Sequence, residues 1–365
     1  MKISGMVMAT LALITLVLLP IAGCRAPVGP QGPVEEEVTF QNGDVTLAGT
    51  LSLPPGSGPH SAVILLSGSG PNDRDFYWSQ MIVDDFNGND IAALRYDDRG
   101  VDGSTGEYLE STIEDMAGDV LAAVELLQNH PNINPEQIGI LGHSYGGILA
   151  SFVTSRSDDV AFIIAMAAPS LDGGTAKVEQ LTFQMRAGGV PEAEIGQQRE
   201  VLTIVMDVAG EGGGLDEILV KLRRAVEALP EGERARRGIT DIDQYVHSIG
   251  ETLQQQFPPL TPFISAIIAY DPAPVLEELT IPILALYGEL DHQVPAEVNS
   301  EAMIRIQKNS GNENFIVEVI PKANHLFQEA VTGGRSEWET LKKELVPGLL
   351  DRITEWVLQY VDMVQ

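Results

Sequence analysis

The chain has 365 residues, of which 44% are hydrophobic and 20% charged, a composition that supports a large core and argues against a disordered chain. Its formal net charge of −30 argues against nucleic-acid binding, because affinity for a phosphate backbone requires clustered Lys and Arg. The charge predicts an acidic, well-solvated surface and says little about the fold.

The first residues predict a targeting segment. Lys2 precedes a long apolar run, which ends in IAGC at residues 21–24. This ending resembles the lipobox of bacterial lipoproteins, in which small residues precede a cysteine that receives lipid. Cys24 is the only cysteine in the chain, so it cannot form an internal disulfide. An uncleaved membrane-spanning helix and an ordinary secretory signal are the alternatives.

We expect residues 1–23 to be a signal peptide, Cys24 to carry lipid, and residues 24–35, rich in Pro and Gly, to be a flexible tether. The protein is then extracytoplasmic and lipid-anchored to a bacterial membrane. Which membrane holds the anchor stays open.

Strand signals follow the tether. Residues 37–54 alternate between apolar and polar around Asn42-Gly43, which predicts a β-hairpin. Continuous apolar runs, which suit strands buried on both faces of a parallel sheet, then occur at residues 62–66, 91–95, 138–142, 161–167, 282–288 and 315–320.

Helical patterns lie between several of these runs. Residues 111–130 open with a capping-box arrangement, Ser111 to Glu114, and carry an apolar stripe. Residues 336–361 also predict a helix, with a break or kink at Pro347. The alternation of strands and helices predicts an α/β fold with a mostly parallel central sheet flanked by helices.

One region interrupts the alternation. Residues 171–270 show no clear strand, which predicts a helical cap inserted between a first part of the core at 36–170 and a second part at 271–365. The segments 210–214 and 230–238 predict loops. The apolar positions of the insertion need burial, among them Leu215, Leu219, Leu222 and Val226. We expect most of them to pack on the body or on each other and the remainder to line a pocket.

Ser144 is the candidate nucleophile. Gly142-His143-Ser144-Tyr145-Gly146 fits G-x-S-x-G between a predicted strand and a predicted helix, the context that a nucleophile elbow requires. The glycines allow a tight turn and leave room for a substrate. The alternative is a glycine-rich turn without chemistry.

A serine hydroxyl needs a base, and His325 is our candidate among six histidines. It follows the predicted strand 315–320, where loops deliver catalytic groups. His143, at the variable position of the elbow, is expected to point away from the serine side, and His292 adjoins an acid too closely for triad geometry. The other three lie in a turn, at a helix end and in the insertion: His60, His130 and His247.

The acid should lie between serine and histidine in the chain. Asp291, just beyond the strand 282–288, is our candidate, with Glu289 as its local competitor and a turn-capping aspartate as the structural alternative.

The oxyanion of a tetrahedral intermediate needs two donors. The N–H of Tyr145, which follows the nucleophile, is one candidate. The second should come from the loop at 67–75, where we favour the N–H of Ser69 with Gly70 as competitor. The charged residues at 73–75 are expected to stabilise this loop with ion pairs.

Taken together, these motifs resemble the α/β-hydrolase superfamily, close to bacterial esterases and serine-aminopeptidase-like hydrolases. The shared motifs are GSGPNDRD, RYDDRGVDGST, GHSYGG, the segment around Asp291 and ANHLF, in the family's order over residues 36–170 and 263–363. The chain departs from the family where Ser67 replaces a common histidine and where Asp102 replaces the glycine of RGxGxS.

The resemblance implies an acyl hydrolase without cofactor or metal, with Ser144, His325 and Asp291 as its triad and a cap over the site. We expect a serine hydrolase acting on carboxylic esters, with a small-molecule acyl substrate of short to medium chain length. A peptidase or amidase on the same triad is the alternative, and a non-catalytic lipid-anchored binding protein is the rival of another class. The oligomeric state stays open.

Overall fold

The computed structural model describes residues 32–256 and 261–361. The predicted signal peptide, Cys24 and most of the tether lie outside these residues. Within the described segments, no helix combines the length and the apolar character that a membrane crossing requires.

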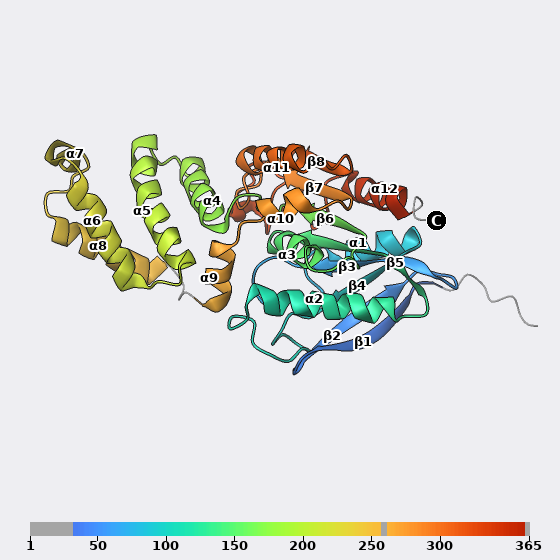
Figure 1. The fold of residues 1–365 in the computed structure, drawn as a ribbon. Helices are drawn as coiled ribbons and strands as arrows, with labels where there is room; N and C mark the ends of the chain where they lie inside the picture. Colours follow the sequence, from blue (N-terminus) through green and yellow to red (C-terminus); the bar gives the residue numbers. More distant parts are fainter. Residues whose placement is uncertain (1–31, 257–260, 362–365) are drawn as a thin grey trace, which may run out of the picture. The chain divides into compact units, whose positions relative to one another are not determined.

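The centre of the fold is an eight-stranded sheet in the order β1-β2-β4-β3-β5-β6-β7-β8 (Figure 1). β1 and β2 form an antiparallel hairpin, β2 pairs antiparallel with β4, and the remaining neighbours are parallel. The strands are β1 (Val34–Asn42), β2 (Val45–Leu53), β3 (His60–Leu66), β4 (Ile91–Tyr96), β5 (Ile133–His143), β6 (Phe162–Met166), β7 (Ile283–Gly288) and β8 (Phe315–Ile320). All the predicted strands are therefore present.

Helices cover both faces of the sheet, as the apolar runs of β3 to β7 require. One hydrophobic cluster joins the sheet to α2 (Ile113–Gln128), α3 (Tyr145–Thr154), α10 (Ala273–Glu278) and α11 (Ala296–Ser310). A second cluster on the other face joins it to α1 (Ser79–Gly88) and α12 (Leu349–Val361). The expected α/β-hydrolase architecture is confirmed.

Two predicted boundaries are shifted by one residue. The hairpin turn is Gly43-Asp44, because Asn42 still pairs with Val45 and its side-chain amide donates to Asp119 of α2. The capping box of α2 is formed by Thr112 and Asp115 instead of Ser111 and Glu114. Asn42 thus belongs to the strand and not to the turn, and Thr112, next to Ser111, is the residue that accepts from the N–H of Asp115.

The prediction of a long C-terminal helix over 336–361 is wrong at its start. Only the short 3-10 helix η1 (Arg335–Glu337) precedes α12, and residues 338–348 are irregular. Gly348 adopts φ 82 after Pro347, and the buried Gln328 donates to main-chain oxygens of Trp338 and Lys342. Long-range hydrogen bonds thus replace the helix that the local pattern favours.

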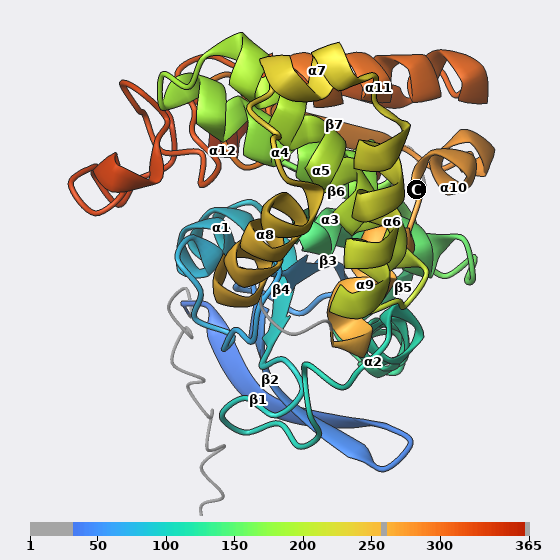
Figure 2. The same ribbon diagram turned by 90° about the vertical axis from the view of Figure 1, so that its left-hand side faces the viewer.

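Residues 171–270 contain helices and no strand within their described part. These are α4 (Gly173–Ala187), α5 (Glu192–Gly210), α6 (Leu215–Ala228), α7 (Glu231–Arg236), α8 (Ile242–Gln256) and α9 (Pro262–Ala269) (Figure 2). The prediction that 230–238 is a loop is wrong, since α7 lies within it. Leu222 and Val226 belong to a hydrophobic cluster formed by these inserted helices and Leu215 and Leu219 pack against it, so these residues stabilise the insertion itself.

The strand order places one loop pair at a functional position. β3 and β5 are neighbours in the sheet. The loop after β3 leads toward β4 on one side and the loop after β5 leads toward β6 on the other, so the two loops run in opposite directions. In open α/β sheets, ligands bind in the crevice outside the carboxyl ends of strands at such a switch point. The loop after β3 begins at Ser67, and the turn after β5 holds Ser144.

Candidate active site

Ser144 occupies a strained turn between β5 and α3. Its backbone adopts φ 53 and ψ −117, a conformation that costs a non-glycine residue about 1–3 kcal/mol. The turn is held because Ser144 N–H donates to Met166 O at 2.7 Å and its carbonyl accepts from Gly147 N–H. Such a turn presents the hydroxyl beyond the end of the sheet, as a nucleophile elbow does.

The glycines around Ser144 permit this turn through close backbone contacts. A Cβ atom on Gly142 would lie 2.1 Å from Gly146 O, and one on Gly146 would lie 2.5 Å from Ser67 O. A Cβ atom on Gly147 would lie 2.6 Å from Ala168 Cβ. The motif therefore brings the elbow directly against the loop that follows β3.

Asp291 and His325 form a buried pair. His325 Nδ1 lies 2.8 Å from Asp291 Oδ2, and the exposed fractions of the two residues are 8% and 1%. Asp291 Oδ1 accepts from the main-chain N–H groups of Gln293 and Val294 at 2.7 and 2.9 Å. With Nδ1–H donating to the carboxylate, the neutral imidazole keeps Nε2 free to accept a proton.

The two loops meet because Gly288 has no side chain. A Cβ atom there would lie 2.6 Å from both Ala323 O and Asn324 O. Leu290 N–H donates to Ala323 O, which fixes the acid loop against the histidine loop. The competitor Glu289 is exposed and accepts from Lys322 N–H, so it does not contact His325.

His143, the residue before Ser144, contacts His325. The rings of His143 and His325 are 4.7 Å apart between centroids, and His143 Nε2 lies 2.8 Å from His325 O. The carbonyl can only accept, so Nε2 carries the proton. Ser144 Oγ itself makes no hydrogen bond to His325 in the described residues, a common feature of sites without substrate.

The contacts of His143 were not predicted from the sequence. Its ring is buried beside Trp78 and against the histidine loop. Burial, with a smaller contribution from the nearby His325, lowers the pKa of His143 to about 3. The ring is therefore neutral at neutral pH, where Nε2–H donates to His325 O.

The loop that carries Ser69 touches the elbow that carries Tyr145. A Cβ atom on Gly68, the residue before Ser69, would be 3.5 Å from Ser144 Cβ. The N–H of Gly70 is already used, since it donates to Tyr108 Oη at 3.0 Å. No hydrogen bond in the described residues uses the N–H of Ser69 or Tyr145, which favours Ser69 over Gly70.

Two of the three charged residues expected to stabilise the loop after β3 form ion pairs: Arg74 pairs with Asp97 and Glu37, and Asp75 pairs with Arg95. Asp73 instead accepts from Asp75 N–H. Asp102, where the family has glycine, adopts φ 45. That is a backbone conformation that glycine adopts with the least strain, which explains the family pattern.

Contacts from the inserted helices and the C-terminal loop surround the acid and the base. Phe183 of α4 packs edge-on against His292, and Gln184 of the same helix donates to His292 O. Trp338 stacks on His325, with ring centroids 6.3 Å apart and planes at 16°. No local pattern signals this contact, because Trp338 lies in the segment that predicted a helix.

No group of three or more His, Cys, Asp or Glu among residues 32–256 and 261–361 is arranged to hold a metal ion.

Comparisons with known proteins agree with the observed fold. Residues 63–331 match the family model described as the alpha/beta hydrolase family. The chain is 28% identical to esterase EstD of Thermotoga maritima over 344 residues, which cover 91% of this chain and 69% of EstD.

Two solved structures share the fold. One is the alpha/beta hydrolase GrgF from Penicillium sp. sh18, with a TM-score of 0.54 and 18% identity, covering 90% of this chain and 99% of GrgF. The other is the esterase Pf2001 of Pyrococcus furiosus, with a TM-score of 0.52 and 15% identity, covering 90% of this chain and 91% of that one.

Proposed function

The chain belongs to the alpha/beta hydrolase family and is a hydrolase, and from this premise we propose that it cleaves carboxylic esters through an acyl-enzyme intermediate on Ser144. Ser144 Oγ attacks the ester carbonyl, and His325 takes the hydroxyl proton and returns it to the leaving alcohol. Asp291 orients the imidazole and stabilises the imidazolium. The N–H groups of Ser69 and Tyr145 receive the oxyanion.

One observation carries the proposal. The 2.8 Å hydrogen bond between His325 Nδ1 and Asp291 Oδ2 lies at the carboxyl edge of the sheet that also presents the strained turn of Ser144. A turn-capping aspartate would account for the bonds to Gln293 and Val294 but not for the bond to His325. The chain order Ser, Asp, His is that of α/β-hydrolase triads.

The choice of esters is supported by a relative. EstD, which is 28% identical over most of this chain, is named an esterase. Amide hydrolysis uses the same three side chains, so the triad alone does not decide between the two substrates.

We also propose a preference for short to medium acyl chains. Phe263 of α9 packs on Tyr108 and on Tyr145, with ring centroids 4.6 and 5.1 Å apart. An aromatic cover next to the nucleophile limits the volume that an acyl chain can fill and excludes water.

The location of the protein at a membrane is a further part of the proposal. The IAGC ending before the only cysteine supports lipidation of Cys24 and an extracytoplasmic location. Expression in a bacterium with radioactive palmitate tests it: the wild type should carry label in the membrane fraction and Cys24→Ser should carry none. An unmodified mature N-terminus at another residue would contradict it.

The activity is tested on the purified protein without its first 23 residues. The substrates are ethyl esters of straight-chain acids from acetate to palmitate and, as amide controls, aminoacyl anilides. We expect kcat/KM to be highest for short and medium esters and lower by at least about 100-fold for the anilides. Turnover of the anilides without turnover of the esters would show that the protein is a peptidase or amidase. Efficient hydrolysis of long-chain esters would contradict the chain-length preference.

A further inference from the structure

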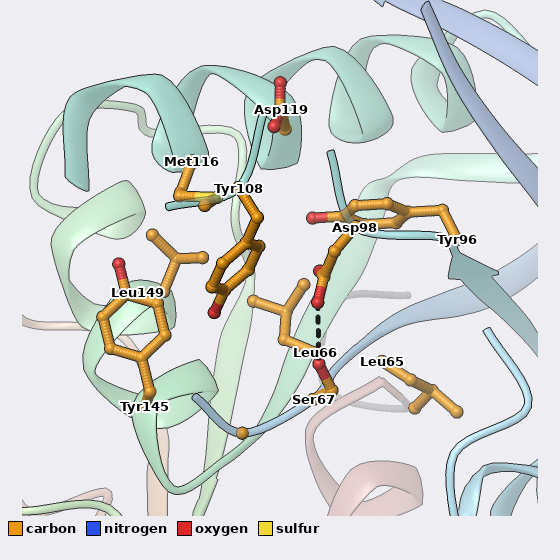
Figure 3. A pocket seen from close by; sticks show the side chains of 11 residues that line it. Leu65, Leu66, Ser67, Tyr96, Asp98, Tyr108, Met116, Asp119, Tyr145 and Leu149 are labelled. Atoms are coloured by element: carbon orange, nitrogen blue, oxygen red, sulfur yellow. Dashed lines mark hydrogen bonds between the residues drawn. The ribbon is translucent and has the colours of Figure 1, made fainter. Parts of the chain in front are cut away.

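A small cavity lies beside the nucleophile, between the loop after β3, the elbow and α2 (Figure 3). Ser67 and Gly68 line it on one side and Tyr145 on another, so it borders the site where the substrate carbonyl would bind. Leu66, Leu149 and Met116 supply apolar walls. Its polar side chains are those of Ser67, Tyr96, Asp98, Tyr108, Asp119 and Tyr145. Asp119 already pairs with Arg99, whereas Asp98, Tyr108 and Tyr145 keep hydrogen-bonding capacity.

The hydrogen-bonding capacity of these three side chains is not used up. Tyr145 is 6% exposed, and its hydroxyl is buried without a hydrogen-bond partner in the described residues. Leaving such a group unpaired costs roughly 1–3 kcal/mol. Tyr108 Oη accepts from Gly70 N–H, and no described acceptor receives its own proton.

Asp98 contributes an acceptor. Its Oδ2 accepts from Asn72 N–H at 3.0 Å and from Ser67 Oγ at 3.4 Å, and no described group donates to Oδ1. Burial raises the pKa of Asp98 to about 7. Both forms of the carboxyl group can accept a hydrogen bond from a neutral donor.

The size of the cavity limits what can enter. The centre of a water-sized group can occupy about 20 Å³ of it, which is enough for one water molecule or one hydroxyl group. An acyl chain of several carbons would not fit in this space. The cavity is therefore suited to a single polar group at a defined position.

The order of the strands indicates which part of a substrate faces the cavity. Ser67 follows β3 and Asp98 follows β4, whereas Asp291 and His325 follow β7 and β8 on the other side of β5. The leaving alcohol must lie near His325, because that residue returns the proton to it. The acyl part then extends from Ser144 toward β3 and β4.

We propose that the cavity formed by Asp98, Tyr108 and Tyr145 is a subsite for a hydroxyl group on the acyl part of the substrate. The enzyme then prefers hydroxyacyl esters to the unsubstituted esters of the same chain length. A hydroxyl can donate to Asp98 and accept from a tyrosine at once, whereas an ammonium group can only donate and a carboxylate would be repelled by Asp98. The inference rests on the proposed esterase function and names its substrate class.

The test compares matched substrates. kcat/KM is measured at pH 7.5 for ethyl butanoate, both enantiomers of ethyl 3-hydroxybutanoate, ethyl 2-hydroxybutanoate and ethyl 3-aminobutanoate. The variants are Tyr145→Phe, Tyr108→Phe and Asp98→Asn, each checked for folding by circular dichroism. Tyr287→Phe is the control, because Tyr287 is a fully buried phenol that does not line the cavity.

We expect at least one hydroxy ester to be preferred over ethyl butanoate by roughly tenfold or more, the value of one or two well-formed hydrogen bonds. Tyr145→Phe and Asp98→Asn should reduce that ratio to within about threefold of unity, and Tyr287→Phe should keep it. Tyr108→Phe supplies the same test if either of the first two variants does not fold.

Three results would overturn the inference while the esterase proposal stands. These are a wild-type ratio near unity, a preference for the amino ester, and a hydroxyl preference that survives in the folded cavity variants. If the wild type hydrolyses none of these esters, the proposed function itself has failed, and the two failures are thereby distinguished.

Discussion

The imidazole Nε2 of His143 lies 2.8 Å from the main-chain oxygen of His325. His143 immediately precedes the proposed nucleophile, so this hydrogen bond joins the elbow to the loop that carries the proposed base. It acts on the backbone of His325 while Asp291 acts on the ring. Together the two contacts fix where the imidazole stands relative to Ser144.

Replacing His143 should therefore affect the chemical step. We expect His143→Leu to lower kcat by roughly 10- to 100-fold with little change in KM, because a misplaced base weakens proton transfer more than substrate binding. His143→Gln, which keeps an N–H donor of similar reach, should recover most of the loss. Equal kcat values for the two variants would show that only packing matters at this position.

Burial of neutral His143 should also make the fold sensitive to acid. Its folded pKa of about 3 lies below the unfolded value of about 6.5, so the stability present above pH 6.5 is lost as pH falls toward 3. The groups around the ring that enter this balance are His325 and Asp291.

Urea unfolding at pH 7 and pH 4 measures this loss. Wild type should lose up to about 3 kcal/mol more than His143→Gln over that interval. His247→Gln is the matched control, because His247 is exposed and its replacement should not alter the pH dependence. An identical acid loss in wild type and His143→Gln would contradict the burial of a neutral ring.

The choice between the two acids is tested by a pair of substitutions. Asp291→Asn should lower kcat by roughly 10³-fold or more, since the amide cannot hold His325 in the tautomer that leaves Nε2 free. Glu289→Gln should retain activity within about threefold, because the exposed Glu289 carboxylate accepts from Lys322 N–H and a glutamine can accept there too. A larger effect of Glu289→Gln than of Asp291→Asn would show that Glu289 is the acid.

Much of this site follows from sequence because local patterns encode it. The glycines around Ser144 are required by contacts of the elbow itself and of the loop beside it, and Asp291 and His325 stand directly after strands that apolar runs identify. The contact between His143 and His325 could not be predicted, since it joins residues 182 positions apart. The same holds for α12, where hydrogen bonds from Gln328 keep residues 338–348 irregular despite a helical pattern.

The buried carboxyl group of Asp98 should lower the free energy of unfolding at neutral pH. Burial raises its folded pKa to about 7 from an unfolded value near 3.8, so the neutral form is favoured in the fold and stability is lost as pH rises from 4 to 7. The titratable groups around it are Asp119 of α2, Tyr96, Tyr108 and Tyr145. Asp98→Asn removes the titration and keeps an acceptor for Asn72 N–H.

We therefore expect Asp98→Asn to gain up to about 4 kcal/mol of unfolding free energy relative to wild type between pH 4 and pH 8. Asp158→Asn, at an exposed position, is the control and should show no such change. A constant difference between Asp98→Asn and wild type across this range would mean that Asp98 is not a buried, destabilised carboxylate.

The central claim is that Ser144 attacks the substrate, and covalent labelling tests it most directly. The purified protein is treated with a fluorophosphonate, digested, and analysed by peptide mass spectrometry. The account predicts one adduct, on Ser144, which is absent from a folded Ser144→Ala variant whose kcat is lowered by roughly 10⁴-fold or more. An adduct on a different serine, or a folded Ser144→Ala variant that turns over within tenfold of wild type, would contradict it.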